Sequence, residues 1–176
     1  MDLTWLITDT HWYHKGMITR AYRPADHQQK SIRHWQTLVK PEDTVIHLGD
    51  VIFGDFSLLP DILAQLPGHK RLIPGNHDHR RKGFLAAGFE TVDDAIAIPV
   101  PGRGEVLLSH APAASLWPGM YLNVHGHLHD DLHRVEEGYP EPWHRLLAIE
   151  FTDFAPVLFH EFIETEGHYG LIPNSN

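Results

Sequence analysis

Short apolar runs divide this chain at regular intervals, and most of them end in a cluster of aspartate and histidine. Runs of this length, rich in β-branched side chains and bounded by turn residues, favour strands over helices. The pattern therefore restricts the chain to a sheet-rich fold in which several strand ends carry polar groups. The expected strands are residues 3–8, 44–48, 71–73, 95–100, 106–108, 121–124, 146–151 and 157–162.

Two longer segments between these runs are predicted to be helices. Residues 26–39 place Ile32, Trp35 and Val39 near helical spacing, and residues 57–66 carry a second apolar stripe with Ser57 as its candidate N-cap. Strands and helices alternate in the first half of the chain, whereas the second half is nearly all strand. This order favours an α/β fold with two packed sheets. Residues 130–142 mix acids, glycine and proline, which predicts an exposed loop.

Length and charge narrow the class of protein. A chain of 176 residues with 42% hydrophobic content suits one compact core, so we expect a single domain over residues 1–176. Its 23 acidic residues exceed its 14 basic residues, which argues against general electrostatic binding of nucleic acid or of an anionic membrane. No apolar stretch approaches membrane-spanning length and no signal peptide is visible, so a cytoplasmic location is expected.

The residue types available for chemistry are histidine and carboxylate, because the chain has 16 histidines and no cysteine. Any metal ion must therefore be held by nitrogen and oxygen, which favours hard or borderline divalent ions. His47 and His125 lie inside or at the end of predicted strands and are predicted to pack or to support neighbouring ligands. His14 and Lys15 follow the first polar cluster and are interpreted either as groups that face a substrate or as exposed residues.

The polar clusters follow five of the predicted strands, at the point where each strand ends. In open α/β sheets the carboxyl ends of the strands line the ligand crevice, so these clusters are expected to converge. Carboxylates and imidazoles gathered at one crevice need a cation to compensate their charge and lost hydration. The sequence therefore predicts a metal site. Its candidate residues are Asp9, His11, Asp50, Asn76, His77, Asp78, His110, His127 and His129.

Five segments in order carry a resemblance to a known family: Asp9-Thr10-His11, Gly49-Asp50, Gly75-Asn76-His77-Asp78, Ser109-His110 and Gly126-His127-Leu128-His129. They resemble the ordered motifs of the calcineurin-like metallophosphoesterases, in particular the small bacterial and phage phosphoesterases. One such motif is weak evidence, but five in the family's order are specific. The resemblance implies a four-layer α/β/β/α sandwich with two mixed β-sheets, and residues 146–162 resemble the family's closing hairpin.

The resemblance also implies a ligand set. One metal ion would be held by Asp9, His11, Asp50 and His129, and a second by Asp50, Asn76, His110 and His127, so that Asp50 bridges the two. Oxygen and imidazole ligands suit divalent manganese, which is the expected ion, and also iron, zinc, cobalt or nickel.

The implied reaction is hydrolysis of a phosphomonoester or phosphodiester in a small substrate, nucleotides and cyclic nucleotides included. Two neighbouring cations can share a water, lower its pKa and direct the resulting hydroxide in line at phosphorus. His77 would then act on the leaving-group oxygen or on the phosphoryl charge, with Asp78 holding its imidazole. Arg80 and Arg81 are interpreted either as substrate contacts or as a solvated turn.

Three other functions fit this pattern less well. The segment Val51-Ile52-Phe53-Gly54 and the acid at Asp78 depart from the motifs of protein serine/threonine phosphatases. A small nuclease is disfavoured because the chain has no room for the DNA-contacting domain of the related repair exonucleases. A non-catalytic, protein-binding scaffold with a vestigial metal site would have lost ligands or the histidine corresponding to His77, and all of them are present.

Overall fold

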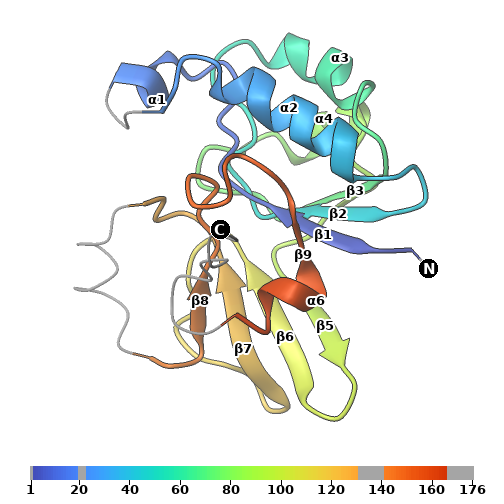
Figure 1. Cartoon of the computed structure of the whole chain (residues 1–176), viewed down its shortest axis with the longest axis vertical. Coiled ribbons are helices and arrows are strands. Elements are labelled where there is room, and N and C mark those ends of the chain that lie inside the picture. The colour runs from blue at the N-terminus through green and yellow to red at the C-terminus, as the bar shows by residue number, and fades with distance from the viewer. Residues whose placement is uncertain (1, 20–22, 131–140, 166–176) are drawn as a thin grey trace, which may run out of the picture.

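A computed structural model describes residues 2–19, 23–130 and 141–165 of the chain. Its described elements form two mixed β-sheets together with helices, which confirms the expected α/β fold (Figure 1). Short strands rich in Val, Ile and Leu form both sheets, because such side chains fill the space between packed layers.

The first sheet has the strand order β4-β3-β2-β1-β9. Its first four strands are parallel to their neighbours, and β9 runs antiparallel to β1. The carboxyl ends of β1, β2 and β3 therefore share one edge of the sheet. The strands are β1 (Thr4–Ile7), β2 (Thr44–His47), β3 (His69–Leu72), β4 (Thr91–Val92) and β9 (Val157–Leu158).

The second sheet has the order β5-β6-β7-β8, with β5 antiparallel to β6 and the other pairs parallel. Leu6 and Ile46 of the first sheet pack with Leu108 and Val124 of the second in one buried cluster, so the two sheets face each other across a shared core. The strands are β5 (Ile96–Val100), β6 (Gly104–Ser109), β7 (Met120–His125) and β8 (His144–Leu146).

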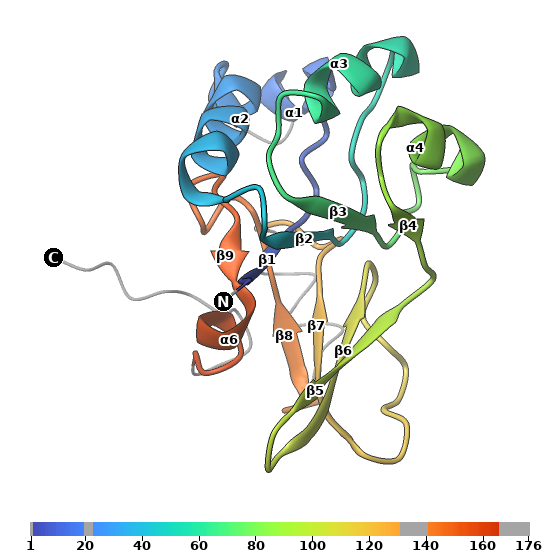
Figure 2. The same cartoon turned by 90° about the vertical axis from the view of Figure 1, so that its right-hand side faces the viewer.

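Helices cover the other face of the first sheet, where α2, α3 and α4 lie together (Figure 2). Trp35, Leu59 and Phe84 project from this layer and are fully buried against strand residues such as Val45 and Leu72. The described helices are α1 (Lys15–Thr19), α2 (His27–Leu38), the 3-10 turn η1 (Phe56–Leu58), α3 (Leu59–Leu63), α4 (Arg81–Ala87) and α6 (Phe159–Phe162). None in the described ranges has the length and apolarity needed to cross a bilayer.

The two C-terminal apolar runs differ from expectation. Strand β8 ends at Leu146 and residues 159–162 form helix α6, so residues 146–162 do not form a hairpin. Instead, β8 pairs with β7 and β9 pairs with β1. Leu147 and Phe162 are both buried between the sheets. Their apolar runs therefore indicate burial, and a buried short helix produces such a run as readily as a buried strand does.

Three short elements were not predicted from the sequence, and the N-cap of the second predicted helix was assigned to the wrong residue. The elements α1, α4 and β4 are too short to show a clear period in the sequence. The turn into η1 is capped by Asp55, whose carboxylate accepts a hydrogen bond from the Ser57 amide at 3.0 Å, and not by Ser57. Of the predicted exposed loop, residues 131–140 lie outside the described part of the chain.

Candidate metal centre

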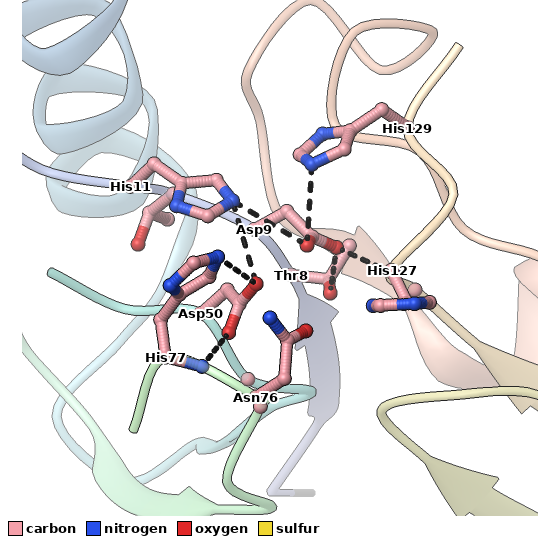
Figure 3. A network of polar contacts seen from close by, with 12 residues as sticks. Thr8, Asp9, His11, Asp50, Asn76, His77, His127 and His129 are labelled. Atoms are coloured by element: carbon pink, nitrogen blue, oxygen red, sulfur yellow. Dashed lines mark hydrogen bonds and ion pairs between the residues drawn. The ribbon is translucent and has the colours of Figure 1, made fainter. Parts of the chain in front are cut away.

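The loops that leave the strand ends are joined to one another by short hydrogen bonds. The Asp9 amide donates to the Gly49 carbonyl at 2.8 Å, and the His11 amide donates to the Asp50 carbonyl at 3.0 Å. From the second sheet, the His127 amide donates to the Asp9 carboxylate at 3.0 Å. Polar residues that are far apart in the sequence are thereby brought to one place (Figure 3).

Glycine permits this close approach at two positions. Gly49 has φ +101°, and a Cβ there would collide with the Gly75 backbone and the His110 ring. A Cβ at Gly126 would collide with the side chains of Thr8 and Asp9. A side chain at either position would push the loops apart, which explains why glycine precedes Asp50 and His127.

Two groups of side chains in the described residues offer ligand atoms within 4.8 Å of one another. The first group is Asp9, His11 and His129, and the second is Asp50, His110 and His127. Each group combines one carboxylate with two imidazoles, a donor set suited to a borderline divalent ion. The structure therefore contains two adjacent places that can each hold a metal ion.

Asp50 lies between the two groups. Its Oδ2 atom is 3.6 Å from His11 Nε2 and also 3.6 Å from His110 Nε2. Asn76 joins the second group through its Oδ1 atom, which is 3.2 Å from His110 Nε2. Five of the seven residues predicted as ligands, His11, Asp50, Asn76, His127 and His129, line one cavity of about 360 Å³. Asp9 and His110 belong to the same two ligand groups.

Buried polar atoms without partners indicate that this arrangement suits a cation. Asp9 and His11 are 1% and 3% exposed, yet Asp9 Oδ1 and both ring nitrogens of His11 make no hydrogen bond in the described structure. A buried acceptor left unpaired is costly, and a cation between such atoms removes that cost. Burial, followed by the nearby His129 and Arg23, lowers the pKa of His11, which keeps the imidazole neutral and able to bind metal.

The backbone at the site is held in an unusual conformation. Asp9, His11, Asp50, His127 and His129 have φ angles of 48°, 45°, 54°, 73° and 55°. Non-glycine residues rarely enter this left-handed region, and each such residue costs on the order of 1–3 kcal/mol. Five of the seven candidate ligands share it, so the surrounding fold imposes their geometry.

A buried salt bridge supports His129. Glu150 Oε1 lies 3.1 Å from His129 Nδ1 and accepts from Arg23 Nε at 2.9 Å. Burial works to raise the pKa of Glu150, but the His129 hydrogen bond and the Arg23 charge outweigh it and lower that pKa to about 2. Burial also works to lower the pKa of His129, and Glu150 and Asp9 raise it instead. A carboxylate on Nδ1 directs Nε2 of His129 toward Asp9, 3.7 Å away.

We expect the Glu150→Gln variant to bind the metal ion at the Asp9–His11–His129 group about 10–100-fold more weakly, because glutamine loses the charge that orients His129. Calorimetric titration of the metal-free protein with Mn²⁺ would measure this change. Glu42→Gln, an exposed carboxylate change, is the matched control. Unchanged affinity for both ions in Glu150→Gln would refute a supporting role for Glu150.

His110 is fixed in a similar way by the backbone. Its Nδ1 atom lies 2.7 Å from the carbonyl oxygen of Leu48. Because a carbonyl can only accept, Nδ1 carries the proton, and in the neutral imidazole Nε2 is then the nitrogen with a lone pair. That nitrogen faces Asn76 and Asp50, as required of a metal ligand.

His77 and Asp78 lie at different depths. The side chain of His77 is 39% exposed, with Nε2 4.0 Å from Asp50 Oδ2, and its amide donates to Asp50 Oδ1 at 3.0 Å (Figure 3). Asp78 is buried, and its carboxylate accepts from the amides of Asp50, Val51 and Gly75 at 2.7, 3.2 and 3.0 Å. Asp78 therefore holds the backbone of Asp50, whereas the sequence suggested that it holds His77. Burial raises the pKa of Asp78 to about 6, although the amides oppose the shift.

The other residues named in the sequence analysis lie either away from the metal cavity or close to it. His47 and His125 are buried within their strands, as expected for packing residues, and Arg81 pairs with Asp94 on the surface. His14 lines the metal cavity, and Arg80 lies over the ring of Phe56.

Sequence reasoning did not identify Arg23, Glu150 or the exposed Phe53 as residues of the site. Glu150 directly follows four apolar residues, as Asp9 follows its own run, but it was counted as part of the predicted strand 146–151.

Several known proteins are similar to this chain in sequence or in fold. The calcineurin-like phosphoesterase family matches residues 3–174 of the chain. The Gene 66 protein of Mycobacterium phage L5 is 34% identical over 133 residues, which span 64% of this chain and 64% of that protein. The Gene 66 protein of Mycobacterium phage D29 is 30% identical over 85% of this chain and 94% of its own length. A crystal structure of a protein of unknown function from Aquifex aeolicus is similar with a TM-score of 0.75 and 27% identity, covering 93% of this chain and 99% of that one.

Proposed function

We propose, on the premise that this chain belongs to the calcineurin-like phosphoesterase family, that it is a two-metal hydrolase of small phosphoesters. The observation that carries the proposal is the pair of adjacent ligand groups with Asp50 between them. Two divalent ions bound there would supply Lewis acidity and an activated water. Manganese is the proposed ion, and the oxygen and imidazole set also suits iron, zinc, cobalt or nickel.

The ligands of the proposed site divide as their positions suggest. Asp9, His11 and His129 would hold one ion, while Asn76, His110 and His127 would hold the other. The single carboxylate of Asp50 serves both groups, because its two oxygens offer several lone pairs. Asn76 adds a neutral oxygen, which limits the negative charge that a phosphate must approach. The salt bridge of Arg23 and Glu150 and the Leu48 carbonyl orient the imidazoles.

His77 is placed to act on the substrate. It is the exposed imidazole beside Asp50, and it lines the metal cavity without belonging to either ligand group. In this position it can donate a proton to the leaving-group oxygen or stabilise charge that develops on the phosphoryl group. Asp78 acts one step further away, by fixing the backbone that presents Asp50.

The proposal is tested by hydrolysis of bis-p-nitrophenyl phosphate and p-nitrophenyl phosphate by the purified chain, first after chelation and then after addition of defined metals. We expect chelated protein to be inactive and Mn²⁺ to restore turnover as two ions bind per chain. Relative rates on the two esters separate phosphodiesterase from phosphomonoesterase activity. Absence of turnover with every tested divalent metal, despite bound ions, would reject a hydrolytic function.

A further inference from the structure

An open cleft lies directly beside the metal cavity. It has a volume of about 670 Å³ and is lined by Tyr13, His14, Lys15, Gly16, Thr19, Phe53, Gly54 and His77. His14 and His77 also line the metal cavity, so the cleft and the cavity have two lining residues in common. A group attached to a phosphate at the metal centre has a direct route into this cleft, whose volume suits a small organic ligand.

Two aromatic side chains are exposed at this cleft. Phe53 is 42% exposed and Tyr13 is 44% exposed, although large apolar side chains are usually buried. The ring of His14 lies parallel to Phe53, with centroids 4.1 Å apart and planes at 16°. His77 meets Phe53 edge to face, with centroids 5.4 Å apart. The aromatic surface is therefore continuous with the residue proposed to act on the leaving group.

The backbone beneath this aromatic surface is fixed to the ligand loops. The Phe53 amide donates to the Trp12 carbonyl at 2.9 Å, and the Trp12 amide donates to the Val51 carbonyl at 2.9 Å. Trp12 itself is fully buried, and its indole nitrogen donates to Ser31 Oγ at 3.0 Å. Phe53 and Tyr13 are thus exposed on a segment that is already ordered, which reduces the entropy lost when a ligand binds.

We propose that this cleft binds the base of a nucleoside phosphoester, with Phe53 as the stacking residue. The inference rests on the proposed function, which places the phosphate at the metal centre. A purine or pyrimidine presents a flat face that stacks on an aromatic ring. It also presents polar edges, which the Lys15 and Thr19 side chains and the glycine backbone of this cleft can satisfy. The chain's net charge of −9 favours a mononucleotide over a polynucleotide as the ligand.

A second cleft that also includes Phe53 is a poorer candidate for the same ligand. It is lined in part by Phe56, Arg80 and Phe84, its volume is only about 230 Å³, and it shares His77 alone with the metal cavity. The cleft lined by Tyr13 and Lys15 is larger and has two lining residues in common with the metal cavity. It therefore suits a nucleoside whose phosphate lies between the ligand groups better than the smaller cleft does.

The test compares binding of two non-hydrolysable ligands to the Mn²⁺-loaded protein by calorimetry. One is the phosphonate analogue of adenosine 5′-monophosphate, with a methylene in place of the ester oxygen, and the other is the matching ribose phosphonate without a base. We expect the adenosine ligand to bind about tenfold or more tightly, because of base stacking. We expect Phe53→Ala and Phe53→Leu to abolish most of this preference while leaving ribose phosphonate binding unchanged.

Phe53→Leu keeps an apolar side chain without a ring, so it separates stacking from simple burial. Trp117→Ala is the matched control, because Trp117 is 61% exposed in the loop before the amino end of β7, away from the strand ends that carry the ligands. Equal binding of the two phosphonates to the wild-type protein, or a preference that survives both Phe53 variants, would overturn the inference. Hydrolysis of bis-p-nitrophenyl phosphate by the same preparation reports separately on the proposed function.

Discussion

The Asp50→Asn variant is expected to lose both metal ions and to lose activity by about 10³-fold or more. Asp50 is 3% exposed and its Oδ2 atom is equally distant from His11 and His110, one imidazole from each ligand group. Asparagine has nearly the same shape but no charge and only one acceptor oxygen, so it cannot bridge the two groups and would weaken the binding of both ions. Metal content after gel filtration should therefore fall from two ions per chain to less than one.

Asp61→Asn makes the same chemical change at an exposed position on α3 and should retain both ions. Circular dichroism of the metal-free proteins separates metal loss from unfolding, because the Asp50 backbone remains bonded to Asp78 in either variant. Two ions per chain in Asp50→Asn, with affinities like those of the wild type, would refute the bridging role.

The His77→Ala variant is expected to retain both metal ions and to lose about 10²–10⁴-fold in turnover of substrates with poor leaving groups. The imidazole belongs to neither ligand group and is the exposed one beside Asp50. If it protonates the leaving oxygen, the loss must be smaller for p-nitrophenolate, which needs little proton assistance, than for an alkoxide. Comparison of methyl p-nitrophenyl phosphate with a dialkyl phosphate would measure this difference.

His79→Ala, an exposed histidine two residues further along the same loop, is the control for His77→Ala. A similar loss on good and poor leaving groups would assign His77 to the phosphoryl oxygens. An inactive His77→Ala protein that has also lost metal would instead make His77 a ligand.

The sequence predicted the position of the site because its signals are local. Each candidate ligand lies in the loop that follows an apolar run, and parallel strands place their carboxyl ends together. The structure accordingly brings Asp9, Asp50, Asn76, His110 and His129 into two adjacent ligand groups. The same local reasoning predicted the two sheets and the helix that contains Trp35.

The supporting contacts were not predictable in this way, because they join positions that no pattern connects. Arg23 and His129 meet Glu150 across separations of 127 and 21 residues. Asp78 was assigned to its neighbour His77, but its carboxylate reaches back 28 residues to the Asp50 amide. Being next to His77 in the sequence did not identify the partners of Asp78. Its buried carboxylate needs several hydrogen-bond donors, and backbone amides supply them.

The left-handed backbone at five candidate ligand positions bears on which ions the protein would accept. Because folding has already fixed these residues, ion capture needs little rearrangement of the loops. The chain then resembles a rigid chelator, whose discrimination between metals depends on ionic radius and on preference for oxygen or nitrogen. An ion whose preferred bond lengths do not match this preset frame would be rejected, since the loops cannot adjust to it without disturbing both sheets.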